Sequence, residues 1–455
     1  MPSSAQYAQP AAALNTRIFR AALSVSLAGI VVKLAAIMKE VTVAGAYGRS
    51  DAMDAYLAAA LVPGLLVNLI AESMNQALIP TLIRVRELEG RGQAQQLFSS
   101  AMLWLCALLV ALCCATAATA RGFFPLIASR FPPAKLDLSI HLFYGLLPAA
   151  LLTAIASNCA AILNSQGRFA IPALAPAAIS AATIAGVPIF GARAGIWAMV
   201  FATLAGSAFY AAAVAGMLPA HGYRLRLWWH GRTTAMIEVA RQYRSVLLSG
   251  VVASGGLLVD QAMAAMLPAG SISALMYAAR FVSVALTLLA GTLATVLAPH
   301  FSELAAACDW TACRRVLRTW AGLAALASFS IALLLIASSH GLVRIAFERG
   351  AFGAADTAIV TRVLRMYAIQ IPFFAVSRVY YRFLLAMRRA DLILGCGTMN
   401  LGLDVVLDIV LMRWMGVAGI ALATSLWTVA TFLFLGFWTR RVLREAAAGR
   451  RGGPA

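Results

Sequence analysis

The chain has 455 residues, of which 62% are hydrophobic and only 12% are charged, with a formal net charge of +19. Soluble domains carry about 25% charged residues, so this composition excludes an ordinary soluble protein of this length. Apolar runs longer than about 18 residues recur along the chain. They predict an all-α polytopic membrane protein.

Twelve apolar segments predict twelve transmembrane helices in chain order. The predicted spans are 18–46, 54–83, 98–120, 138–163, 169–190, 194–217, 243–266, 273–299, 317–338, 357–387, 391–412 and 416–438. Several exceed 25 residues, so we expect tilted, kinked or protruding helices. Interior prolines give the kinks a specific cause; they are Pro63, Pro148, Pro172 and Pro372.

The distribution of basic residues predicts the orientation of the chain. With both termini inside, the cytoplasmic segments hold 21 Lys and Arg residues and the outer segments hold eight. This bias follows the positive-inside rule. The same distribution argues against a nucleic-acid partner, because the basic residues do not form one face with interleaved aromatic residues. The N-terminus lacks the pattern of a signal peptide, so we expect a retained cytoplasmic tail.

Two similar segments indicate an internal repeat. "SMNQALIPTLIRVRELEGRGQAQQLF" (73–98) closes the second span, and "GTLATVLAPHFSELAAACDWTACRRVL" (291–317) closes the eighth. The offset predicts two six-helix lobes in a parallel repeat around a central cavity. We expect an N-terminal tail (1–17), an N-terminal lobe (18–220), a cytoplasmic connector (221–242), a C-terminal lobe (243–438) and a basic tail (439–455).

Ionisable residues inside the spans are the candidate functional residues, because such residues rarely face lipid. Lys33 and Glu40 are seven residues apart and share a face of the first helix, whereas Lys39 projects elsewhere. Lys33 and Arg280 are near mid-span, one in each lobe. Further candidates for supporting or coupling roles are Asp54, Glu72, Asp260 and Arg378. For Asp54, a simple ion pair explains the residue as well as a role toward the substrate does.

Asp404 and Asp408 form an i, i+4 pair on the eleventh span. For this pair we favour a structural ion pair with Arg378 or Arg382. Cys308 and Cys313 lack the spacing of a zinc site, so we expect no metal site. The five histidines show no triad or metal spacing, so we expect no catalytic residue and no enzymatic activity.

Two cations in one cavity suit an anionic ligand such as a phosphate or pyrophosphate, because they compensate its desolvation. A proton-coupled exporter of cationic drugs would instead need a dominant carboxylate. We therefore favour a phosphorylated lipid precursor as the ligand.

Several motifs resemble the MurJ/MviN family of lipid II flippases, within the multidrug/oligosaccharidyl-lipid/polysaccharide exporter superfamily. "YGRSDAMDAYLAAALVPGLLVNLIAESMNQALIPTL" (47–82) resembles the first hairpin of the family, and "AGSISALMYAARFVSVALTLLAGTLATVLAPHFSEL" (269–304) its eighth helix. "AFERGAFGAADTAIV" (346–360) resembles its E-R-G-A-F motif. "NLGLDVVLDIVLMRWMGVAGIALATSL" (400–426) resembles its eleventh and twelfth helices.

The resemblance implies a flippase in the bacterial inner membrane for an undecaprenyl-pyrophosphate-linked glycan. It places the pyrophosphate-binding cations at Lys33, Lys39 and Arg280 and the acidic position at Asp54. The family usually has Arg at the two first-helix positions, and Lys grips phosphate less specifically. Ala279 replaces an acidic residue. The family usually has fourteen helices, so twelve would fit a paralogue serving an exopolysaccharide.

Three functions therefore remain open: a flippase for lipid II or a polysaccharide repeat unit, a cation-coupled drug exporter, and a non-transporting scaffold in envelope biosynthesis. We expect no cofactor and leave coupling to the membrane potential or to a monovalent ion open. The expected partners are the glycan lipid, membrane lipids and envelope-biosynthesis proteins, and we expect a monomer.

Overall fold

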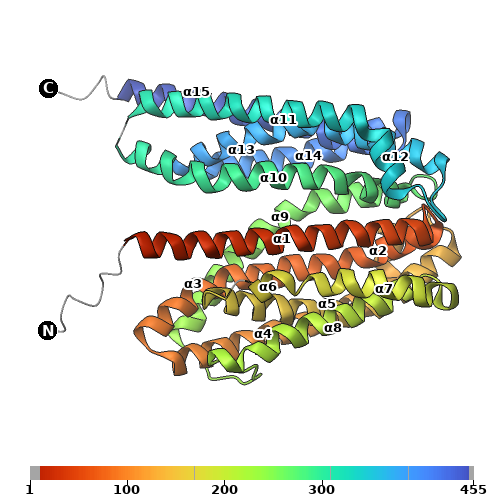
Figure 1. The fold of residues 1–455 in the computed structure, drawn as a ribbon, viewed down its shortest axis with the longest axis horizontal. Coiled ribbons are helices and arrows are strands. Elements are labelled where there is room, and N and C mark those ends of the chain that lie inside the picture. Colours follow the sequence, from red (N-terminus) through yellow and green to blue (C-terminus); the bar gives the residue numbers. More distant parts are fainter. Residues whose placement is uncertain (1–10, 169, 308, 388, 450–455) are drawn as a thin grey trace. The chain divides into compact units, whose positions relative to one another are not determined.

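The computed structural model describes residues 11–168, 170–307, 309–387 and 389–449. Their side chains are described outside residues 11–27, 249, 252, 253, 255, 257, 288, 290–300, 302, 305, 306, 390 and 447–449. Within this part of the chain every regular element is a helix (Figure 1). The predicted all-α class is therefore confirmed. Of the predicted tails, residues 1–10 and 450–455 lie outside the described residues.

Each of the twelve predicted spans overlaps one long helix or a run of consecutive helices. In the described part of the chain, nine stretches are long and apolar enough to cross a membrane by length and composition. They are Asp51–Leu88, Arg91–Ile127, Pro133–Ser165, Ala170–Ala194, Trp197–His221, Trp310–Phe347, Ala354–Ala386, Asp391–Met415 and Val417–Ala446. The membrane class follows from these helices, while the exact count of twelve spans stays a prediction.

The chain forms two compact units. The first comprises the described residues up to Ala46, together with Ala59–Phe124 and Pro133–Val251. The second comprises Tyr47–Ala58, Pro125–Pro132 and the residues from Val252 onward. The turn of the first hairpin is thus part of the second unit, although the helices on both sides of it continue into the first. The predicted lobe boundaries, the repeat and the central cavity stay predictions.

The first unit packs around a core of buried apolar residues that several long helices contribute. Its elements are α1 (Ala11–Tyr47), α2 (Asp51–Leu66), the π-helical turn η2 (Val67–Ala71), α3 (Glu72–Leu88), α4 (Arg91–Ile127), α5 (Pro133–Ser165), α6 (Ala170–Leu174), α7 (Ala177–Ala194), α8 (Trp197–Met217), η3 (Pro219–His221) and the start of α9 (Thr234–Ala265). Met74, Phe98, Leu105 and Ile162 are fully buried in its core. Burying apolar side chains in this way stabilises the unit by about 25 cal/mol per Å².

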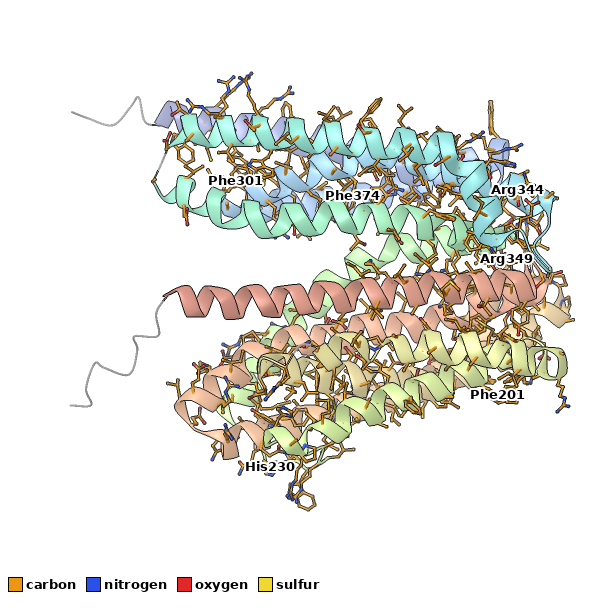
Figure 2. All side chains as sticks on the ribbon, viewed as in Figure 1. Phe201, His230, Phe301, Arg344, Arg349 and Phe374 are labelled. Atoms are coloured by element: carbon orange, nitrogen blue, oxygen red, sulfur yellow. The ribbon has the colours of Figure 1, made fainter. Side chains whose placement is uncertain are left out.

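The connector between η3 and α9 packs along α4 in the first unit. Gln95 exchanges two hydrogen bonds with the backbone of Arg224: its Nε2 donates to the carbonyl at 2.8 Å, and its Oε1 accepts from the amide at 2.9 Å. The His230 amide donates to Ser100 Oγ at 3.1 Å (His230 is labelled in Figure 2). These bonds satisfy backbone N–H and C=O groups of connector residues that lie outside the described helices.

The second unit contains the rest of α9 with α10 (Ser271–Ala306), α11 (Trp310–Phe347), α12 (Ala354–Ala368), α13 (Gln370–Ala386), α14 (Ala390–Met415) and α15 (Val417–Gly449). α13 packs against α10, α11 and α15, so it lies at the centre of this unit (Figure 1). Buried Phe301 of α10 meets Phe383 of α13 edge-on, with ring centroids 5.7 Å apart (Phe301 is labelled in Figure 2).

Two of the four predicted proline kinks coincide with interruptions. α12 ends at Ala368 and α13 begins at Gln370, because Pro372 has no N–H to donate to the carbonyl of residue 368. α6, which holds Pro172, ends at Leu174 before α7 begins. Pro63 and Pro148 lie inside α2 and α5, and the kinks predicted there stay predictions.

Candidate functional site

Two of the three predicted pyrophosphate-binding cations, Lys33 and Arg280, lie on long apolar helices. Lys33 lies about four turns before the end of α1 at Tyr47, and Arg280 lies about two and a half turns after α10 begins at Ser271. Lys33 is half-buried, and Arg280 is exposed on its helix. Lys33 belongs to the first unit and Arg280 to the second. Their predicted meeting in a shared cavity therefore stays a prediction.

Lys39 and Glu40 form an ion pair inside α1. The distance from Lys39 Nζ to Glu40 Oε1 is 3.3 Å, and the Glu40 side chain is only 3% exposed. Helical spacing predicts Lys39 on another face from Glu40, but its long side chain reaches the neighbouring carboxylate. The pair neutralises both charges locally, which lowers their cost in an apolar helix. Lys33 is thus the better candidate of the two lysines for an anionic ligand.

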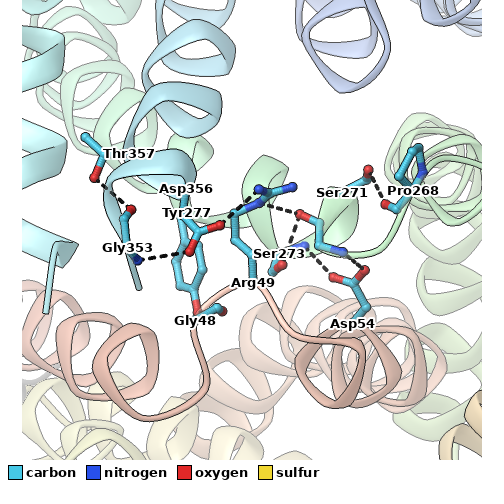
Figure 3. A network of polar contacts seen from close by, with 11 residues as sticks. Gly48, Arg49, Asp54, Pro268, Ser271, Ser273, Tyr277, Gly353, Asp356 and Thr357 are labelled. Carbon is cyan, nitrogen blue, oxygen red and sulfur yellow. Dashed lines mark hydrogen bonds and ion pairs between the residues drawn. The ribbon is translucent and has the colours of Figure 1, made fainter. Parts of the chain in front are cut away.

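Asp54 binds backbone amides at the start of α10. Its carboxylate accepts hydrogen bonds from the backbone amides of Gly270 at 2.7 Å and Ser273 at 3.0 Å (Figure 3). The side chain is buried. A helix begins with unpaired N–H groups and a positive dipole end, and a carboxylate compensates both. Asp54 therefore caps α10 from the first hairpin, while the supporting or coupling role predicted for it stays a prediction.

Arg49 extends this contact toward α12. Arg49 Nε donates to the Gly270 carbonyl at 2.9 Å, and its Nη1 lies 3.1 Å from Asp356 Oδ1 (Figure 3). Asp356 Oδ2 also accepts from the Gly353 amide at 3.0 Å, at the start of α12. Arg49 and Asp356 were not among the sequence candidates. Asp356 lies within the 346–360 motif, so the motif was the available signal for it.

Gly48 allows the hairpin turn to pack closely against the segment before α12. Its φ is +55°, and a side chain there would collide with the backbone carbonyl of Ala351. The Gly48 carbonyl accepts a hydrogen bond from the Tyr277 hydroxyl at 3.0 Å (Figure 3). The Tyr277 ring packs against Phe347 and Phe352, with centroids 5.1 and 5.7 Å away. We name the contacts of Gly48, Arg49 and Asp54 with α10 and α12 the hairpin junction.

Replacing Asp54 by Asn should loosen the hairpin junction. The Asn side chain has one acceptor oxygen where two amides need one each, and its NH₂ group would face an N–H donor. We expect a loss of about 1–3 kcal/mol in the free energy of unfolding, measured as thermal unfolding of the purified protein in detergent. Asp51→Asn is the matched control, because Asp51 is exposed on the first turn of the same helix. Equal thermal stability of the two variants would contradict the capping role.

Three carboxylates meet inside the second unit. Asp260 of α9 and Asp404 and Asp408 of α14 each offer an oxygen within 4.8 Å of the others. Asp404 and Asp408 are buried, at 3% and 0% exposed. At Gly256, one turn before Asp260, an added Cβ would lie 3.0 Å from Asp404 Oδ2. The absence of a side chain at this glycine therefore lets α9 approach α14 closely. We name these three residues the aspartate triad.

The triad is short of compensating groups. Within the described residues, one oxygen of Asp260, one of Asp404 and both of Asp408 are buried without a hydrogen-bond partner. Three ionised carboxylates this close repel one another in an apolar interior and lose their hydration. A bound cation or shared protons would remove that repulsion. Oxygen ligands of this kind suit hard cations.

In the described part of the chain, the structure does not show the ion pair that the sequence favoured for Asp404 and Asp408. Among the described residues neither carboxylate forms an ion pair with Arg378 or Arg382, the partners favoured above. The Arg378 guanidinium instead lies over the Phe374 ring, 4.5 Å from its centroid (Phe374 is labelled in Figure 2). Periodicity places Asp404 and Asp408 on one face of α14, but only the fold shows that Asp260 is opposite them.

Glu72 opens α3 directly after the π-helical turn η2. Ser157 Oγ donates to Glu72 Oε1 at 3.0 Å, and Asn75 Nδ2 donates to the same hydroxyl at 3.0 Å. These residues line a hollow of about 570 Å³ in the first unit, together with Gln76, Asn164 and Tyr210. π-helical turns are frequent at functional sites. Amide, hydroxyl and carboxylate groups there can hydrogen-bond a polar ligand such as a sugar.

Long apolar helices that carry embedded charges and a cluster of three carboxylates define a polytopic membrane protein. The chain belongs to the lipid II flippase family MurJ, whose family model matches residues 43–449.

Curated relatives match over most of the chain. A probable lipid II flippase MurJ of Synechocystis is 24% identical over 432 residues, covering 90% of this chain and 80% of the relative. A lipid II flippase MurJ of Burkholderia cenocepacia is 27% identical over 380 residues, covering 77% and 70%.

Solved structures share the fold. A lipid II flippase MurJ in an inward closed conformation has a TM-score of 0.77 at 22% identity, covering 91% of this chain and 87% of that one. An inward-facing multidrug resistance transporter of the MATE family has a TM-score of 0.78 at 12% identity, covering 92% and 96%. At these identities the likeness establishes the fold alone.

Proposed function

We propose that this protein is a flippase that moves an undecaprenyl-pyrophosphate-linked glycan precursor across the bacterial inner membrane by alternating access. The observation that carries the proposal is the pair Lys33 and Arg280, placed on apolar helices of a chain that belongs to a family of lipid flippases. The substrate class is peptidoglycan lipid II, with an exopolysaccharide repeat unit as the alternative. Both termini are cytoplasmic in this proposal, following the bias of basic residues.

A pyrophosphate needs cations wherever it leaves water. Moving an ionised group into a medium of low dielectric constant is costly unless an opposite charge compensates it. Lys33 and Arg280 supply positive charge at a depth that the headgroup must pass. Arg280 can bind phosphate oxygens through two parallel hydrogen bonds, whereas Lys33 acts as a point charge. The saccharide would find hydrogen-bond partners in the polar hollow beside Glu72.

We further propose that the aspartate triad holds the coupling cation. The unpaired oxygens of Asp404 and Asp408 support this role. A monovalent cation or protons entering the triad would change the packing of α9 against α14. Transporters of related design use carboxylates near the middle of the membrane for this purpose.

A cation-coupled drug exporter is the second candidate, since the fold is shared with a MATE-family transporter. The cations at Lys33 and Arg280 repel a cationic drug, so this candidate requires that neither residue lines the transport path. A scaffold without transport activity is the third, and it predicts no substrate turnover at all.

Depletion of the protein in its own cells distinguishes these functions. We expect an undecaprenyl-pyrophosphate-linked glycan to accumulate, because its translocation stops while its synthesis continues. Mass spectrometry of the lipid extract identifies it: accumulated lipid II indicates peptidoglycan synthesis, and an accumulated repeat unit indicates a polysaccharide. An unchanged pool of lipid-linked glycans would contradict the flippase proposal. Complementation with the wild-type chain is the control.

A further inference from the structure

Two adjoining hollows lie at one end of the second unit. The larger, about 580 Å³, is lined by Arg314 and Arg318 of α11 and by Arg440 and Arg444 of α15. The other, about 470 Å³, is lined by Phe432, Leu433, Gly436 and Phe437 of α15. Both hollows share Tyr380, Arg440 and Arg444. The two hollows therefore adjoin, and we name them together the groove, which is basic in one part and apolar in the other.

The basic part has positive charge without matching negative charge. Arg314 and Arg318 are one turn apart on α11, and Arg440 and Arg444 are one turn apart on α15, so each pair shares a helix face. All four are exposed. Among the described residues none of them forms an ion pair, whereas neighbouring Arg441 pairs with Glu445 at 2.8 Å. Four uncompensated cations around one hollow attract an anion.

One further side chain favours a phosphate there. Thr439 lines the same hollow and is fully buried. Its hydroxyl has no hydrogen-bond partner among the described residues. An oxygen-rich anion in the hollow could accept from that hydroxyl and from the guanidinium groups.

The apolar part continues the basic part along one face of α15. Leu433, Gly436, Phe437, Arg440 and Arg444 follow one another at helical spacing, apolar first and basic last. Leu433 and Phe437 are exposed although large and apolar. This order matches that of a phospholipid, whose acyl chains would lie along Leu433 and Phe437 while its phosphate meets the arginines.

We propose that this groove is a binding site for an anionic phospholipid, distinct from the path of the transported glycan lipid. With the termini oriented as proposed above, the groove faces the inner leaflet. Basic pockets between membrane helices on the cytoplasmic side are known to bind anionic headgroups. A lipid held between α11, α13 and α15 would bridge three helices that pack on one another.

The test is native mass spectrometry of the purified full-length chain released from bilayers of defined composition. We expect wild-type protein to retain phosphatidylglycerol in preference to phosphatidylcholine. The double variant R440Q/R444Q should bind phosphatidylglycerol roughly 30-fold more weakly, since each basic residue contributes about fivefold. R224Q/R226Q is the matched control, because it removes two exposed arginines from the connector, outside the groove. It should retain the lipid.

A second variant tests the apolar part without changing charge. Gly436→Leu fills the groove, because even a Cβ there would lie 3.2 Å from the Tyr380 ring. It should also release phosphatidylglycerol. Equal retention by wild type and R440Q/R444Q, or equal loss in the connector control, would overturn the proposal. Displacement of the lipid by millimolar inorganic phosphate would assign the hollow to a soluble phosphate and overturn it as well. Melting temperatures of all variants report whether they remain folded.

Discussion

Arg280→Ala should abolish translocation while leaving the protein folded and inserted. The side chain is exposed on α10, so its removal leaves no cavity in a packed core. A charge-assisted hydrogen bond contributes about 1.5–3 kcal/mol, and Arg280 can make two with a pyrophosphate. Their loss reduces substrate binding by at least tenfold. Lys33→Ala should have a similar effect from the other unit, because it removes the second compensating charge.

Proteoliposomes provide the measurement. A fluorescent undecaprenyl-pyrophosphate saccharide is placed in both leaflets, and a quencher that does not cross the membrane reports how much of it moves. Arg413→Ala is the matched control, since Arg413 is exposed on the last turn of α14 and outside the predicted cavity. Lys33→Arg should preserve transport, because it keeps the charge and adds bidentate donors. Wild-type rates in both alanine variants would refute the cationic binding site.

Asp408→Asn should remove the dependence of the protein on a coupling cation. Asp408 is fully buried, and both its oxygens lack hydrogen-bond partners among the described residues. Replacing it by a neutral amide relieves repulsion within the aspartate triad, so the variant should be no less stable than wild type without the cation. Wild type, in contrast, should be stabilised by the cation, by about 2.7 kcal/mol at a concentration of 100 Kd.

Thermal unfolding in sodium, potassium and choline chloride at constant ionic strength identifies the cation, and the same series at several pH values distinguishes it from protons. Transport in proteoliposomes with and without a cation gradient then tests the coupling. Asp391→Asn is the matched control on the same helix, because its exposed pair with Arg389 contributes little. If wild type and Asp408→Asn respond alike to every cation and pH, the triad is not the coupling site.

The helices themselves could be predicted closely. The span predicted at 98–120 lies within α4, and that at 138–163 lies within α5. Such agreement is expected, because a membrane-spanning segment must satisfy its own backbone and be apolar along its length. The predicted spans are shorter than the helices, because helices extend beyond the apolar run, as α11 does at both ends.

The candidate site was predictable only in part. The charges of Lys33, Asp54, Asp260 and Arg280 stand out in apolar sequence, since each is costly unless it serves a purpose. Their partners do not stand out. Arg49 reads as an ordinary loop residue, and its bonds to Gly270 and Asp356 join positions more than 200 residues apart. No local pattern encodes such a pairing.

By itself, the sequence determined that this is an all-helical membrane protein, which charged residues lie in its apolar segments and which family it resembles, because hydropathy and motif spacing are local properties of the chain. Only the tertiary structure decided that Asp54 caps α10 and that Asp260 completes a triad with Asp404 and Asp408. The reason is physical. A charge inside a membrane protein has the role that its neighbours give it, and those neighbours are brought together by packing between distant helices.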